Sequence, residues 1–98
     1  MNVYINIYQK KGEVLVAACD EELLGKTFKE GRLKLEVKEA FYKGSLKELS
    51  DAVRLISNSD VANLVGRRIV GAVVEEGIAD SRAVISIAGV PHLQIMRM

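Results

Sequence analysis

The chain has 98 residues, of which 49% are hydrophobic and 28% are charged, as is typical of one globular domain with a buried core. Fourteen basic and thirteen acidic residues leave a net charge of +1, so the composition gives no general attraction to phosphate backbones or anionic lipids. The longest apolar stretch, residues 61–74, contains Arg67 and Arg68 and is shorter than the roughly 20 residues that span a bilayer. A lone cysteine, Cys19, has no partner for an internal disulfide, and we therefore expect a cytoplasmic protein without membrane association.

The first half of the chain reads mainly as strands. Apolar and polar residues alternate over residues 3–8, and residues 14–19 are apolar on both faces, which predicts a β-hairpin whose second strand lies inside a covered sheet. The acids in Asp20–Gly25 predict a short helical turn. Strict alternation over residues 33–38 predicts a third strand with one dry face and one wet face.

The second half reads as two helices followed by two strands. Ser45 and Glu48 match a capping box, which predicts a helix beginning at Ser45, and residues 57–60 then form a helix-helix turn. Residues 61–76 project as a second amphipathic helix that Gly77 ends, with Gly66 on its buried side packed closely by a neighbour. Residues 83–87 and 93–97 are predicted strands joined by a turn through Gly89, Pro91 and His92. Together these elements predict a single α+β domain over residues 1–98, with a mostly antiparallel sheet of about five strands and two packed helices.

Four separated motifs resemble one known family. These are residues 19–26 (CDEELLGK), 41–44 (FYKG), 62–66 (ANLVG) and 89–94 (GVPHLQ), and they occur in the same order along essentially the whole chain. The sequence resembles the archaeal domain-of-unknown-function family 424. The resemblance implies a small α+β protein of the archaeal cytosol and carries no activity or catalytic residues to this chain.

The sharpest catalytic hypothesis joins Cys19, Asp20 and His92. A thiolate nucleophile needs a nearby base, and an imidazole needs an orienting carboxylate, so these three residues could fill those roles. The alternative is that Cys19 is a small buried hydrophobe at a strand end and that His92 is an ordinary turn residue.

The same residues raise the question of a metal site. Cys19, His92 and one carboxylate of Asp20, Glu21 or Glu22 would leave an open coordination position on zinc. None of the recognised ligand spacings is present, and acidic capping of a helix explains the carboxylates equally well. We therefore expect no metal and no cofactor.

Candidate binding residues lie on the predicted second helix and in the last turn. Asn63, Arg67 and Gly71 are spaced i, i+4, i+8, which on a helix would set an amide and a guanidinium beside a gap suited to a phosphate, a carboxylate or a partner backbone. His92 and Gln94 extend this candidate surface. The alternative is a solvated helix face with its arginines paired to nearby acids.

A locally basic stretch offers a further hypothesis. Five basic residues lie between positions 26 and 38, and Tyr4, Tyr8, Phe41 and Tyr42 supply rings that could stack on RNA bases. Against RNA binding, Glu30, Glu36 and Glu39 interleave with the lysines, and no RNA-recognition signature is present.

The function predicted from these residues is a non-enzymatic binding or interaction module. Its surface would comprise the 19–26 turn, Asn63 with Arg67, and the 89–94 turn, and its partner would be RNA or a protein of the information-processing machinery. The rival hypothesis is a small enzyme using Cys19 and His92 on an anionic substrate. A homo-oligomer would form if the last strand exposed an edge.

Overall fold

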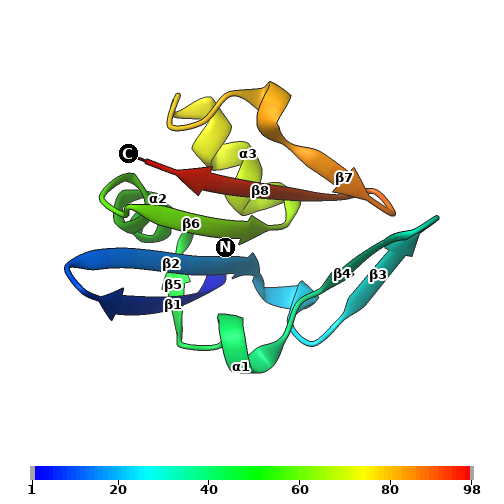
Figure 1. The fold of residues 1–98 in the computed structure, drawn as a ribbon, viewed down its shortest axis with the longest axis horizontal. Coiled ribbons are helices and arrows are strands. Elements are labelled where there is room, and N and C mark those ends of the chain that lie inside the picture. Colours follow the sequence, from blue (N-terminus) through cyan, green and yellow to red (C-terminus); the bar gives the residue numbers. More distant parts are fainter. Residues whose placement is uncertain (1, 98) are drawn as a thin grey trace.

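The computed structural model describes residues 2–97 and has a six-stranded sheet at its centre (Figure 1). The strands lie in the order β5-β1-β2-β6-β8-β7. Their bounds are β1 (Asn2–Lys10), β2 (Glu13–Asp20), β5 (Ser45–Glu48), β6 (Val61–Val65), β7 (Ile85–Ile87) and β8 (Val90–Met96). Over residues 2–97, β2 and β6 run parallel, and the remaining neighbours in this sheet pair antiparallel.

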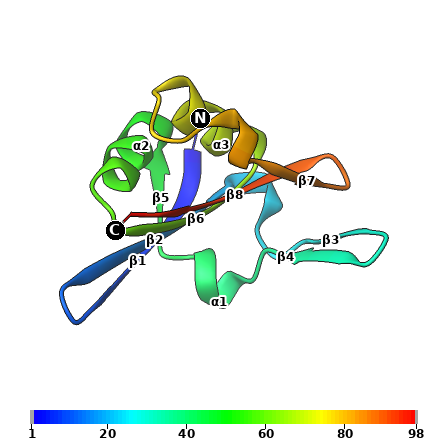
Figure 2. The same ribbon diagram turned by 45° about the horizontal axis from the view of Figure 1, so that its top comes forward.

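Helices and a separate hairpin cover the two faces of the sheet (Figure 2). Helices α2 (Leu49–Ser57) and α3 (Arg67–Glu75) pack on one face. The other face carries the short helix α1 (Glu39–Tyr42) and a two-stranded hairpin of β3 (Thr27–Glu30) and β4 (Leu33–Glu36). Two 3-10 turns complete the chain, η1 (Glu21–Leu23) and η2 (Ser81–Ala83). Within the described residues, no helix has the length and apolarity needed to cross a bilayer.

Two apolar clusters result, one on each side of the sheet. The cluster under α2 and α3 includes Val16, Leu64 and Ile69, and the cluster on the opposite face includes Ala17, Cys19 and Val65. Successive residues of β2 and β6 therefore alternate between two buried environments, because side chains of a strand point alternately to its two faces. The predicted hairpin of the first two strands, the covering of both faces and the helical turn after Asp20 are all confirmed.

The prediction of a helix beginning at Ser45 is wrong. Ser45–Glu48 is strand β5, paired antiparallel to β1 from Ile5 opposite Ser45 to Asn2 opposite Glu48, and the helix begins only at Leu49. A capping box reports only local sequence. Here the backbone groups of residues 45–48 find their hydrogen-bond partners on the free edge of β1 rather than in a first helical turn. Gly44 permits this approach, because a β-carbon there would lie 2.2 Å from the carbonyl oxygen of Ile5.

The second predicted helix also begins too early. Residues 61–65 form β6 at the centre of the sheet, so residues 57–60 connect a helix to a strand rather than to another helix. A strand buried on both faces has no polar side, and a short apolar run of this kind is not distinguished from a helix by periodicity. Helix α3 occupies only Arg67–Glu75, and Gly77 follows its end as predicted.

The last turn is shorter than predicted. Ala88 and Gly89 both have positive φ values, +52° and +79°, as a two-residue hairpin turn requires, and β8 already begins at Val90. Pro91 and His92 therefore lie on a strand, opposite Ser86 and Ile85 of β7. The α+β class with a mostly antiparallel sheet is confirmed, and the sheet has six strands. The strand predicted over residues 33–38 is present as β4, but it pairs with β3 in a separate two-stranded sheet, and neither β3 nor α1 was predicted.

Candidate binding site

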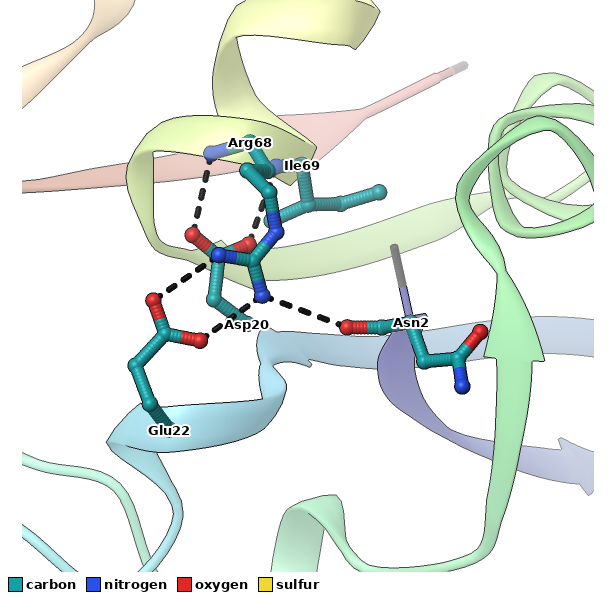
Figure 3. Close-up of polar contacts among 5 residues, drawn as sticks. All are labelled: Asn2, Asp20, Glu22, Arg68 and Ile69. Carbon is teal, nitrogen blue, oxygen red and sulfur yellow. Dashed lines mark hydrogen bonds and ion pairs between the residues drawn. The ribbon is translucent and has the colours of Figure 1, made fainter.

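Asp20 ends β2 and caps a helix that lies far from it in the sequence (Figure 3). Its side chain is buried, with 2% of the residue exposed. One carboxylate oxygen accepts a hydrogen bond from the backbone N–H of Arg68 at 2.9 Å, and the other accepts one from Ile69 at 3.1 Å. These N–H groups belong to the first turn of α3, which has no helical partners for them and favours a negative charge. Asp20 thus fixes the start of α3 against the end of β2.

Gly66 makes room for this carboxylate. It is the residue before α3 and has φ = +121°, which side-chain-bearing residues rarely adopt. A β-carbon on Gly66 would lie 2.3 Å from Cγ of Asp20. The predicted close packing at Gly66 is therefore present, but it occurs at a strand-to-helix junction and the neighbour is Asp20.

Arg68 and Glu22 form a two-point ion pair beside this junction (Figure 3). The guanidinium Nη1 donates to Oε2 of Glu22 at 2.9 Å and Nη2 donates to Oε1 at 2.7 Å, while Nη2 also donates to the carbonyl of Asn2 at 3.3 Å. The hydrogen bonds from Arg68 lower the pKa of the Glu22 carboxyl, and those to Glu22 raise the pKa of Arg68. The η1 turn is thereby tied to α3 and to β1.

An open cavity of about 450 Å³ lies next to this ion pair. Three segments that are distant in the sequence line it. They are the end of β2 with η1, the start of α3, and the β7–β8 turn. Its lining residues are Asp20, Glu22, Leu23, Arg67, Arg68, Ala88, Gly89, Val90 and Pro91. The backbone N–H of Gly66 donates to the carbonyl of Pro91 at 2.9 Å, which holds α3 and β8 together here.

Arg67 is the cation of this cavity that is available to a ligand. Its side chain is exposed, and among residues 2–97 it has no ion-pair partner, whereas Arg68 is held by Glu22. The apolar lining near it comes from Leu23, Val90 and Pro91. A free guanidinium beside an apolar wall suits a ligand that carries both an anionic group and a flat apolar part.

The proposed catalytic pair is separated by one strand. Cys19 lies opposite Val65, and Val65 in turn lies opposite His92, so the three side chains share a sheet face with Val65 in the middle. Two strand spacings put the Cα atoms of Cys19 and His92 about 10 Å apart. Asp20 points to the opposite face, and both of its oxygens bind α3, so it does not orient the His92 ring.

The thiol of Cys19 is not disposed to act as a nucleophile. The residue is fully buried, and burial together with the charges of Asp20 and Glu22 raises its pKa to about 12. Burial also lowers the pKa of the half-buried His92. A thiol needs positively charged neighbours to ionise near neutral pH, and here its charged neighbours are carboxylates. In residues 2–97, no three side chains of His, Cys, Asp or Glu converge on one point as metal ligands would.

The predicted stripe of Asn63, Arg67 and Gly71 does not exist, because Asn63 lies on β6 and the other two lie on α3. Asn63 instead lies opposite Gln94 and on the same sheet face as His92, the face that carries α1 and the β3–β4 hairpin. The structure therefore brings Asn63, His92 and Gln94 together on one face and puts Arg67 at the cavity.

Sequence reasoning missed the role of Asp20 as a cap for α3 and the pairing of Glu22 with Arg68. A capping acid is normally sought next to its helix, and here 48 residues separate Asp20 from Arg68. The available signal was the combination of an acid directly after a fully apolar strand and a glycine directly before two arginines.

Comparison with known proteins places the chain in a family without giving an activity. A search of curated proteins gives no match. Among solved structures, the chain is similar to an uncharacterized conserved protein from Methanopyrus kandleri, with 28% sequence identity and a TM-score of 0.80 over all of this chain and 95% of that one. Residues 8–98 match the model of the family described as "Protein of unknown function (DUF424)". The chain therefore belongs to the DUF424 family.

Proposed function

We propose that this protein is a non-enzymatic binding module that contacts single-stranded RNA through the β3–β4 hairpin and the adjoining cavity. The observation that carries the proposal is the charge of the hairpin. Residues 26–38 contain Lys26, Lys29, Arg32, Lys34 and Lys38 against Glu30 and Glu36, an excess of three positive charges. All seven of these side chains belong to exposed residues.

Both acids of the hairpin are engaged within the protein. Lys34 forms an ion pair with Glu36 at 3.1 Å, and the Glu30 carboxylate accepts a hydrogen bond from the backbone N–H of Ala88 at 2.7 Å. The hydrogen bond from Lys34 lowers the pKa of the Glu36 carboxyl, and the charges of Lys34, Lys38 and Lys29 act in the same direction.

The two strands also set like charges against each other. Lys29 lies directly opposite Lys34 in the β3–β4 register, an arrangement that weakens a sheet. Phe28 and Leu35 occupy the inner face and pack on the core, so Lys29 and Lys34 face away from the body. A polyanion bound to this outer face would relieve their repulsion.

The hairpin is tied to one side of the cavity. The hydrogen bond from Ala88 to Glu30 joins the hairpin to the turn that lines the cavity. A strand of RNA lying along the hairpin would meet Arg67 next, where a phosphate could bind the guanidinium and a base could rest against Leu23 and Val90. Single-stranded RNA offers both groups at a spacing of one nucleotide.

The rival hypothesis of an enzyme has less support. Cys19 is buried with a raised pKa, and Val65 lies between it and His92. An accessible thiolate with a base in hydrogen-bond reach is the minimum for that chemistry, so the binding module is the function that the geometry favours.

Binding is measured by fluorescence anisotropy with a labelled 12-nucleotide single-stranded RNA of mixed sequence. The variant K29E/K34E should bind at least tenfold more weakly and show a shallower dependence of affinity on salt, because fewer counterions are released. The matched control K10E/K11E reverses two exposed lysines at the β1–β2 end of the molecule and should bind within twofold of wild type. Equal affinities for the two variants would contradict the proposal.

A further inference from the structure

We infer that the groove between α2 and α3 docks a basic amphipathic segment of a partner protein. The groove has a volume of about 980 Å³. The two helices that form it lie on the sheet face opposite the β3–β4 hairpin (Figure 2). Its lining residues are Glu48, Leu49, Ser50, Val53, Arg54, Ser57, Ala72, Glu75, Glu76 and Ile78.

The floor of the groove is apolar. Leu49 and Val53 come from α2, Ala72 comes from α3, and Ile78 follows α3. All four are only partly buried, and Leu49, Val53 and Ile78 also pack against the core. A small residue, Ala72, leaves space between the helices for an apolar side chain of a partner.

The rim of the groove is acidic. Glu75 and Glu76 are exposed, and within residues 2–97 neither forms a salt bridge. The one cation, Arg54, is directed to Asp51 at 3.5 Å. The groove therefore carries an excess of negative charge.

The position of these acids on α3 is unfavourable for the helix itself. In α2, Asp51 lies in the first turn and Arg54 in the last, as the helix dipole favours. In α3, the order is reversed, with Arg67 and Arg68 at the start and Glu75 in the last turn with Glu76 after it. At the start, Asp20 and Glu22 compensate for the arginines. At the end, no residue of the described chain compensates for the two glutamates.

Cations from another molecule would pair with the acidic rim of the groove and would compensate the negative charge at the end of α3. An amphipathic segment with apolar residues spaced three or four apart would fill the floor, and lysines or arginines flanking them would meet Glu75 and Glu76. RNA does not fit this groove, because its phosphates would meet carboxylates of the same charge. The groove shares no residue with the cavity or the hairpin proposed to bind RNA, so the inference is independent of that proposal.

The probe is a synthetic 14-residue peptide of leucine and lysine with helical amphipathic spacing, titrated into the ¹⁵N-labelled full chain and followed by NMR. We expect shift changes concentrated at residues 48–57 and 72–78. The variant E75Q/E76Q should bind the peptide about fivefold more weakly, as expected for the loss of two exposed ion pairs. The control E13Q/E39Q removes two exposed acids outside the groove and should bind as wild type does.

Further measurements distinguish docking in the groove from non-specific binding and from self-association. An analogue peptide with every lysine replaced by glutamate should not bind. Ala72→Lys fills the floor of the groove with a charge of the same sign as the peptide, and it should abolish binding while circular dichroism shows an intact fold. Equal binding of the analogue, equal binding by E75Q/E76Q, or shifts outside the groove would overturn the inference. Concentration-dependent dimerisation that E75Q/E76Q removes would assign the groove to a second copy and would overturn it as well.

Discussion

The carboxylate of Asp20 occupies the space that a side chain on residue 66 would fill, since a β-carbon on Gly66 would lie 2.3 Å from Cγ of Asp20. The end of β2 and the start of α3 are joined by this contact and by two hydrogen bonds to the same carboxylate. The cavity beside it depends on that junction, because Gly66 also donates to Pro91 on β8.

Replacement of Gly66 by alanine should lower the free energy of unfolding by about 3 kcal/mol, because the change combines a disfavoured positive φ with a clash against a buried carboxylate. Urea unfolding followed by circular dichroism measures it. Gly71→Ala is the matched control, since nothing lies within 4 Å of a β-carbon there and alanine suits a helix better than glycine. A Gly66 variant as stable as wild type would show that the junction is not tightly packed.

Asp20→Asn should also destabilise the fold, by about 2 to 3 kcal/mol. The amide keeps the size of the side chain but loses its charge, and its NH2 group would face one of the two N–H donors of α3. Glu21→Gln removes an exposed acid next to it and should change stability by less than about 0.5 kcal/mol. Similar losses for both variants would mean that Asp20 does not cap α3.

The thiol of Cys19 should be unreactive in the native protein. Its burial and its raised pKa predict slow iodoacetamide modification at pH 8 that becomes fast in denaturant. Rates measured against pH give the apparent pKa of the thiol. Rapid native-state modification with an apparent pKa below the ordinary value would favour the enzyme hypothesis instead.

Stability should fall at alkaline pH more steeply in wild type than in Cys19→Ala. The native pKa of Cys19 is about 12 against an ordinary 9.0, so above pH 9 the unfolded chain loses a proton that the native state keeps. The stability that comes from keeping the Cys19 thiol protonated is fully present below pH 9. It is lost as pH rises toward 12, at up to about 1.4 kcal/mol per pH unit. Tyr42, whose pKa burial raises from 10.0 to about 12, acts in the same direction in both proteins. Parallel stability curves between pH 9 and 11 would contradict the assignment.

Strand β2 and the last two strands could be predicted from the sequence because their apolar patterns and turns are local properties. Strand β6 could not, because VANLV is apolar on both sides and its parallel partner β2 lies more than forty residues earlier. Ser45 shows the same limit in another form. Its capping-box pattern competes with pairing to β1, and only the tertiary fold decides between them.

The site was predictable in outline only. The segments containing Asp20, Arg67 and Pro91 were singled out from the sequence, and the structure brings them to one cavity. The pairing of Cys19 with His92 was proposed from chemical type alone, and the register inserts Val65 between them. Residue type indicates which chemistry is possible, whereas strand order determines which side chains meet.

The proposal that the hairpin and cavity bind RNA is tested most directly by an NMR titration of the ¹⁵N-labelled chain with the 12-nucleotide single-stranded RNA. The account predicts shift changes concentrated at residues 26–38, 67–68 and 88–91, which weaken as salt is raised. Shift changes centred instead on the β1–β2 turn or on the α2–α3 groove, or an unchanged spectrum at millimolar RNA, would contradict it.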